Sequence, residues 1–317
     1  MKITQLKGGS LSSTSLFEDG DKKFIRKKIS TRENREYGFV RWYSQLKKLQ
    51  RFGQTGLFPK ILNVAYENNT AYFDIEYLHG YKDIKTILAE DNLTENEIQK
   101  IYDAIMVAFN KLHTNSYAAN PGAPKLYFKE EVTQKLSDSF KHSIFYNFYE
   151  FGTLNTFEYN GQITHGIQNF LPELKNFFDE MVLESEEDIH GNPTLENMMY
   201  SFEEDKVVFI DPYEESIIDS KLLDYSQVLQ CSRSCYGFIN DRVVMVDGTS
   251  VWHNLQLPNN LKVFNKMFES NLKQKEIIDV LEATQFIRML PFKCAAGDFE
   301  KAKYFYVHAC HLLSKIF

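Results

Sequence analysis

The sequence predicts an α+β protein with a small β-rich N-terminal lobe and a larger, mainly helical C-terminal lobe. Two observations support this fold class: the first eighty residues alternate as strands around one helix, and after Gly80 the apolar residues recur at helical spacing. The chain has 317 residues, a length that suits one large domain or two lobes. We place the lobes at residues 1–79 and 80–317, with the crossing near residues 76–82.

Five strand-like segments precede Gly80, and they predict a largely antiparallel five-stranded sheet. Asp19-Gly20 is a strong hairpin signal between the second and third segments, and Glu67-Asn68-Asn69 is a turn between the last two. The expected strands are residues 2–6, 14–18, 22–29, 61–66 and 70–77.

One helix is expected between the third and fourth strands, beginning near Ser30 or Thr31 and running to about Gln50. Ser or Thr can cap a helix N-terminus, acidic Glu33 suits the first turn, and Gly53 follows the end. Its expected apolar stripe is Tyr37, Val40, Tyr43 and Leu46.

The C-terminal part reads mainly as helices. A helix begins at residues 92–95 and carries an apolar stripe of Ile98, Ile101, Ile105, Ala108 and Leu112. Residues 126–160 are aromatic-rich and are expected to be partly helical, and residues 171–183 form another helix. Short strands are expected near residues 188–189 and 206–210, with mostly helical structure from residue 222 onward.

Composition excludes several classes of protein. The formal net charge of −7 argues against a broad basic face for nucleic acid, and no apolar run reaches the roughly 18 residues of a membrane span. The N-terminus lacks the apolar segment of a signal peptide, so we expect a cytoplasmic protein. Four cysteines are too few for a disulfide framework and lack zinc-site spacing, which predicts buried free thiols. The sequence does not specify an oligomeric state.

The segment from His190 to Met199, with the apolar run and Asp211 that follow it, carries the chemistry. Phosphoryl transfer needs a group that orients the attacking hydroxyl and oxygen ligands that hold Mg²⁺ against nucleotide phosphates. In a loop of this kind, Asn192 can accept a hydrogen bond and so orient the hydroxyl, and the Asn197 amide can supply one oxygen ligand to Mg²⁺. Asp211, at the end of an apolar strand, would supply another metal ligand.

This segment resembles the aminoglycoside phosphotransferase and choline kinase family, whose catalytic loop reads His-Gly-Asp, four residues, Asn, before a strand that ends in Ile-Asp. His190, Gly191, Asn197 and Asp211 match the pattern. The resemblance implies a protein-kinase-like bilobal fold with ATP or GTP between the lobes. It also implies Mg²⁺ on Asn197 and Asp211, and phosphoryl transfer to a hydroxyl of a sugar, an amino alcohol or an aminoglycoside.

Asn192 stands where the family carries its catalytic Asp. A carboxylate can accept the proton of the substrate hydroxyl, whereas a neutral amide can only accept a hydrogen bond. Three explanations stay open: an engineered inactivating substitution, a natural chain that is catalytically weak or purely binding, and a misleading resemblance.

In the N-terminal lobe, Lys27 is the predicted phosphate-binding cation. It lies between Ile25 and Ile29 on the apolar face of the third strand, where an ammonium is costly unless it is paired. Lys28 would be the phosphate-binding cation if the strand register shifts by one. The alternative is that Lys27 has no such role and belongs to a solvated basic run, Arg26-Lys27-Lys28. Glu36 is the expected acidic partner of Lys27, with Glu33 one turn earlier as the alternative. It is equally consistent with the sequence that both are ordinary surface residues near the helix N-terminus.

Two backbone segments complete the predicted nucleotide site. The Gly8-Gly9-Ser10 turn can cover phosphates, because glycines let backbone amides approach them closely, although such a turn is common in hairpins. Residues 74–78, followed by Gly80, resemble the inter-lobe hinge, which implies that the backbone of Glu76 and Leu78 binds adenine. An ordinary edge strand is the alternative there.

Two other functions remain possible on the sequence. One is a binding protein of the same fold that holds a nucleotide or metabolite without turnover, which Asn192 allows. The other is a metal-dependent hydrolase built on His190 and Asp211, although His190 more simply braces the loop through hydrogen bonds. No motif identifies the phosphoryl acceptor.

Overall fold

The computed structural model describes residues 1–6, 12–32, 36–90, 92–141, 146–213, 216–241 and 244–317, without the side chains of residues 36, 37, 146 and 147. These residues divide into two compact units. The first unit contains Met1–Ile87, Gln99–Leu112 and His190–Ser216, and the second contains Leu88–Ile98, His113–Ile189 and Ile217–Phe317. The first unit therefore joins the N-terminal sheet to the segment that carries the predicted chemistry.

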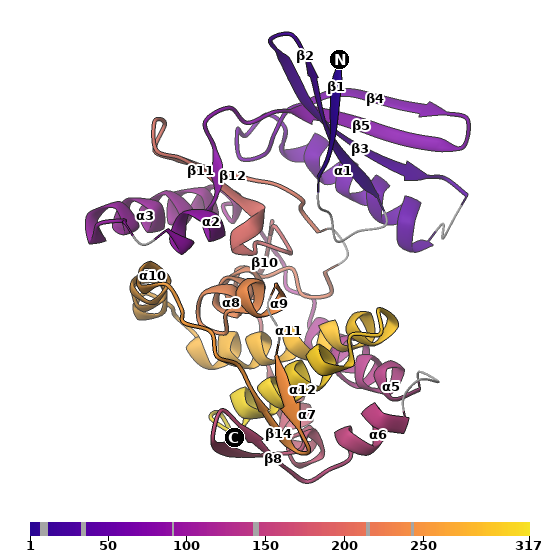
Figure 1. Ribbon diagram of the computed structural model, residues 1–317, viewed down its shortest axis with the longest axis vertical. Helices are drawn as coiled ribbons and strands as arrows, with labels where there is room; N and C mark the ends of the chain where they lie inside the picture. The colour runs from indigo at the N-terminus through magenta and orange to yellow at the C-terminus, as the bar shows by residue number, and fades with distance from the viewer. Residues whose placement is uncertain (7–11, 33–35, 91, 142–145, 214–215, 242–243) are drawn as a thin grey trace. The chain divides into compact units, whose positions relative to one another are not determined.

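The first unit is built on an antiparallel sheet of five strands in the order β1-β2-β3-β5-β4 (Figure 1). The hairpin between β2 and β3 turns at Gly20, whose φ of 59° is left-handed, and it closes with Asp19 opposite Lys22. All five predicted strands are confirmed. Their bounds are β1 Lys2–Leu6, β2 Ser13–Asp19, β3 Lys22–Ser30, β4 Ile61–Glu67 and β5 Thr70–Glu76.

A π-helical turn, Glu36–Val40, leads into helix α1, Arg41–Phe52, which lies along one face of the sheet (Figure 1). The predicted apolar stripe is wrong at Val40 and Tyr43, which are 43% and 40% exposed, and confirmed at Leu46, which is buried; the Tyr37 side chain lies outside the described residues. A π-helical turn holds an extra residue, so it rotates the phase of the helix that follows it. The buried apolar face is instead Trp42, Leu46, Leu49 and Phe52, and the Trp42 ring lies 5.3 Å from that of Phe73 on β5.

The rest of the first unit is a smaller antiparallel sheet in the order β12-β11-β6, with part of helix α3. The Phe209 ring at the end of β12 lies 5.3 Å from Phe109 of α3. This contact anchors the strand that precedes Asp211. The elements are β6 Lys82–Asp83, α2 Ile84–Ala89, α3 Glu95–Leu112, a 3-10 turn Leu195–Asn197, β11 Met198–Ser201 and β12 Lys206–Phe209.

The second unit is mainly helical, and its core is the packing of α11 against α8 and α12. Its helices are α4 Ala123–Tyr127, a π-helical turn Phe128–Thr133, α5 Gln134–Lys141, α6 Tyr146–Gly152, a 3-10 turn Ile167–Asn169, α7 Leu171–Glu180, α8 Lys221–Ser232, α9 Tyr236–Asn240, α10 Asn259–Ser270, α11 Lys275–Ala295 and α12 Phe299–Leu313.

The sequence predicted no strands within residues 126–160 or after residue 222, and the structure corrects this. Four short strands, β8 Thr156–Tyr159, β9 Gln162–His165, β13 Met245–Asp247 and β14 Ser250–Trp252, pair in the order β13-β14-β8-β9. The pairing of β14 with β8 joins residues about ninety positions apart, which local periodicity cannot reveal. The unit also contains a short pair, β7 Ser116–Tyr117 with β10 Glu186–Glu187.

All four cysteines are free and buried, as predicted. Within the described ranges, no helix combines the length and the apolar composition that crossing a membrane requires.

Candidate active site

The loop that begins at His190 is held from inside by the histidine itself. His190 is completely buried, and its ring packs against those of Phe58 and Phe209, 5.9 and 5.3 Å away. Its Nδ1 accepts a hydrogen bond from the backbone N–H of Asn192 (3.1 Å), so Nε2 carries the proton and donates to the Ile210 carbonyl (2.9 Å). Both ring nitrogens are therefore committed to the backbone. The histidine braces the loop and is not arranged to bind a metal.

Gly191 is required by the close approach of two loops. Its φ is 81°, and a Cβ there would lie 2.5 Å from the Tyr213 carbonyl oxygen and 2.9 Å from Ser216 Oγ. The Tyr213 N–H also donates to the His190 carbonyl at 2.9 Å. The loop at residues 190–192 and the segment after Asp211 are thus in direct contact.

Asn197 joins the two ends of the loop at residues 192–197. Its side-chain Nδ2 donates to the backbone carbonyl of Asn192 (2.9 Å), and its own carbonyl accepts from the N–H of Ile210 (2.9 Å). Because the amide nitrogen is engaged, Oδ1 is the atom available to a ligand. Asn192 is half-buried, and no hydrogen bond of its side chain is recorded among the described residues.

Asp211 follows β12 in a left-handed conformation, with φ of 52°. Asp and Asn tolerate this conformation better than most other residues with a side chain. The carboxylate is half exposed, and its Oδ1 accepts a hydrogen bond from Lys27 Nζ at 2.7 Å. The predicted metal ligand and the predicted phosphate cation are therefore brought into direct contact.

Lys27 lies on the inner face of β3 and is only 5% exposed, whereas Lys28 is exposed. Besides Asp211, its ammonium donates to Gln45 Oε1 at 2.8 Å. The sequence predicted Glu36 or Glu33 as the partner. Glu33 and the Glu36 side chain lie outside the described residues, so those pairings stay predictions, and Gln45 is a partner that the sequence did not reveal.

Helix α1 contributes a second cation that the sequence did not single out. Lys48 is 5% exposed, and its Nζ donates to the carbonyl of Tyr213 (2.7 Å) and, at 3.4 Å, to that of His190. The sequence signal that could have revealed Lys48 is its place on the buried side of an amphipathic helix. Its acceptors are backbone carbonyls far along the chain, which no local pattern identifies.

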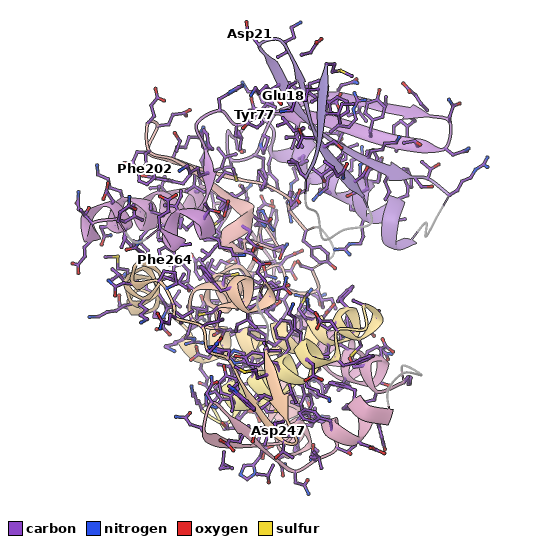
Figure 2. The ribbon with its side chains drawn as sticks, in the orientation of Figure 1. Glu18, Asp21, Tyr77, Phe202, Asp247 and Phe264 are labelled. Atoms are coloured by element: carbon purple, nitrogen blue, oxygen red, sulfur yellow. The ribbon has the colours of Figure 1, made fainter. Side chains whose placement is uncertain are left out.

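The predicted hinge follows β5. The Glu76 N–H donates to the Lys60 carbonyl (2.9 Å), so that amide is taken, whereas the described residues provide no recorded partner for the N–H of Leu78. At this end of the sheet Lys23 pairs with Glu18 (2.6 Å) and lies over the Tyr77 ring. Figure 2 shows Glu18 and Tyr77 near each other. Ser10, predicted to cover phosphates, lies outside the described residues.

The residues present suit a hard cation, although their number is small. Across the part of the chain that the structure describes, no group of three or more His, Cys, Asp or Glu side chains is placed to hold a metal ion. The Asp211 carboxylate and the Asn197 amide oxygen belong to loops joined by the Ile210–Asn197 hydrogen bond. Oxygen donors of this kind fit Mg²⁺, which keeps several waters and binds few protein ligands.

Comparison with known proteins bears on the fold of this chain. No family model and no curated protein matches the chain. Among solved structures, the chain is similar to a spectinomycin phosphotransferase crystallised with ADP and spectinomycin. The TM-score is 0.55 at 9% sequence identity, over 98% of this chain and 93% of that one. At this identity the likeness shows the fold alone: the protein has the kinase-like α+β fold that the sequence predicted.

Proposed function

We propose that this protein binds a nucleoside triphosphate with Mg²⁺ and belongs functionally to the phosphotransferases that act on a hydroxyl of a small molecule. The observation that carries the proposal is the contact of buried Lys27 with Asp211, which follows β12 and is preceded by Ile210, whose N–H is bonded to the loop that holds Asn192 and Asn197. The ADP of the structural neighbour supports a nucleotide as the ligand.

Lys27 is suited to bind phosphates. An ammonium has three N–H donors, and within the described residues two of them are used, by Gln45 and Asp211. Next to Lys27, on the same face of the sheet, three apolar side chains stand in register and are only half-buried: Leu16, Ile25 and Ile75. We propose that they cover the adenine or guanine ring, and that the Leu78 N–H and the Glu76 carbonyl bind its edge.

Asn197 and Asp211 would hold Mg²⁺ through Oδ1 and the carboxylate. A bound magnesium ion would neutralise charge on the phosphates. The protein's own contribution is to hold these oxygens in place, through the hydrogen bonds of Asn197 to Asn192 and of His190 to Ile210. We propose that residues 1–79 supply most of the nucleotide contacts and residues 80–317 the catalytic loop and the acceptor site.

Asn192 decides between two candidate functions. As an amide it can orient an acceptor hydroxyl but cannot take its proton, which costs about 10²- to 10⁴-fold in rate. The protein is therefore a weak phosphotransferase whose activity an aspartate would restore, or a binding protein of the same fold, the function that Asn192 itself favours.

The experiment is a comparison of the chain that carries Asn192 with its Asn192→Asp variant. Both are assayed for Mg²⁺-dependent transfer from ATP and from GTP to aminoglycosides, choline, ethanolamine and simple sugars. We expect the aspartate variant to raise the rate on one acceptor class by two orders of magnitude or more, in line with the value of a general base. Asp211→Asn in that background is the matched negative control, because Asn also tolerates the left-handed backbone.

The two candidates give different results. Unchanged activity with nucleotide still bound, measured by calorimetry, would leave the binding protein as the function. Failure of the chain that carries Asn192 to bind ATP, ADP, GTP or GDP with Mg²⁺ would contradict both candidates.

A further inference from the structure

Three polar side chains of α1 stand on one face of the helix and reach the same short segment. Arg41, Gln45 and Lys48 are spaced i, i+4 and i+7, which places them on one side of an α-helix. The Arg41 guanidinium lies 5.0 Å from the centre of the Tyr213 ring, Gln45 bonds the Pro212 carbonyl, and Lys48 bonds the Tyr213 carbonyl. Helix α1 thus holds the backbone directly after Asp211 at successive points.

The middle residue of this stripe also holds Lys27. Gln45 Oε1 accepts from Lys27 Nζ at 2.8 Å, while Gln45 Nε2 donates to the Pro212 carbonyl at 3.1 Å. The orientation of the amide is settled by its neighbours, because an ammonium requires the oxygen and a carbonyl requires the nitrogen. One turn earlier, Trp42 Nε1 donates to the Lys27 carbonyl at 3.2 Å, so α1 fixes the main chain of Lys27 as well.

We propose that Gln45 is a positioning residue that couples the phosphate-binding Lys27 to the backbone following the metal-binding Asp211. This inference rests on the proposed nucleotide function. The amide links the two groups because it is both acceptor and donor, and Lys27 links back to Asp211, which closes a ring of three contacts.

The ring explains why the helix presents an amide to Lys27 instead of a carboxylate. Glu at position 45 would strengthen the attraction to Lys27 but would have no hydrogen to donate to Pro212. A carboxylate oxygen would then face the carbonyl oxygen at about the present distance, and two acceptors repel. We therefore expect Gln45→Glu to weaken nucleotide binding, although it introduces the more obvious ion pair.

The test measures binding of Mg²⁺–ADP by calorimetry for Gln45→Glu and Gln45→Met, with Gln50→Met as the control. Gln50 lies on the same helix and is exposed. Its substitution therefore makes the same change of Gln to Met without removing the contacts to Lys27 and Pro212. Gln45→Met loses its hydrogen bond to the charged Lys27, and Gln45→Glu loses the one to the Pro212 carbonyl and sets two acceptors face to face. We expect a fall in affinity of about tenfold or more for each variant. The control should bind as the wild type does.

A double-mutant cycle separates positioning from general destabilisation. If Gln45 acts through Lys27, then Gln45→Met should cost little further affinity in a Lys27→Met background. Additive losses, or a Gln45→Glu variant that binds as tightly as the wild type, would overturn the proposal.

A nucleotide-free measurement tests the coupling even if the proposed function is wrong. Without Gln45, the amides of Asp211 and Tyr213 should exchange hydrogen for deuterium faster, because one of the contacts holding this backbone is lost. Faster exchange in the Gln45 variants and not in Gln50→Met supports the coupling whether or not nucleotide binds. Unchanged exchange overturns it. A wild type that binds no nucleotide while the exchange responds contradicts the proposed function alone.

Discussion

Gly191 is a residue at which a single added methyl group would be felt directly. The residue combines a left-handed φ with a backbone oxygen 2.5 Å from the position of a Cβ. We expect Gly191→Ala to lower the free energy of unfolding by about 2 kcal/mol or more, since strain of about 1–2 kcal/mol adds to the clash.

Gly20 provides the matched control for this substitution. Its φ of 59° is also left-handed, but no atom lies within 4 Å of a Cβ there. Gly20→Ala should therefore carry the conformational cost without the clash. Chemical denaturation of both variants measures the difference, and equal losses would show that the contact between the two loops is unimportant.

Residue by residue, the sequence was informative wherever chemistry is local. Alternation along β3 predicted that Lys27, and not Lys28, points inward, and the structure shows this burial. The loop motif predicted that His190 braces its own loop, and both ring nitrogens do so. Gln45 was not predictable, because its contacts depend on how α1 is rotated against the sheet.

At the scale of elements, Arg233 at the end of α8 pairs with acidic residues of both α10 and α11. Arg233 donates to Glu269 (2.7 Å) and Asp279 (2.6 Å) and also pairs with Glu282, which is fully buried. Burial raises the pKa of Glu282, an effect that the adjacent Arg233 opposes. The carboxylate therefore depends on Arg233 for its charge compensation.

We expect Arg233→Leu to destabilise the protein by about 3–5 kcal/mol, because it leaves a buried carboxylate without its main partner. The double variant Arg233→Leu/Glu282→Leu should recover part of that loss, since the desolvated charge is removed as well. Thermal or denaturant unfolding of the two variants measures the recovery. A double variant less stable than Arg233→Leu would contradict this account.

Elements also show where periodicity misled the sequence analysis. The stripe expected on the helix before β4 assumed one continuous α-helix from residue 31. The π-helical turn at Glu36–Val40 changes the phase, so Val40 and Tyr43 face outward while Trp42 packs on Phe73. The spacing of apolar residues in the sequence does not by itself reveal the extra residue of a π-helical turn.

At the scale of the whole molecule, stability should depend on pH through histidines buried in the second unit. Burial lowers the pKa of His311 to about 4 from its ordinary 6.5, and burial also holds the pKa of His308 well below that value. His311 stacks on Tyr159 at 4.5 Å, and the Tyr159 hydroxyl contacts His308 Nδ1 at 2.7 Å.

The sign follows from proton binding. Between pH 6.5 and about 4 the unfolded chain holds a proton on residue 311 that the folded side chain does not. Stability is therefore fully present above pH 6.5 and falls as the pH decreases, by about 1.4 kcal/mol per pH unit for this residue. His311→Gln should reduce the slope of unfolding free energy against pH in this window.

The corresponding change at an exposed histidine, His165→Gln, is the control and should leave the slope nearly unchanged. Denaturation curves at several pH values between 4 and 7 provide both slopes. An identical slope in the wild type and His311→Gln would show that His311 is protonated in the folded protein.

The order of strands and helices was predictable from short-range patterns: alternating strands around one helix, then helical spacing. The kinase-like fold was implied by the resemblance of the loop motif before an apolar strand, and the chain shares that fold with its solved structural neighbour over nearly its whole length at 9% identity. The same local reasoning identified Lys27, Asn192, Asn197 and Asp211 as the candidate site.

Tertiary structure alone decided which groups meet. Lys27 and Asp211 are 184 positions apart, and Lys48 reaches a carbonyl 165 positions away. The sheet that pairs β14 with β8 was likewise invisible in the sequence. Periodicity specifies which face of an element is buried, but the register between elements depends on packing among distant side chains, so the partners of a buried charge emerge only when the chain has folded.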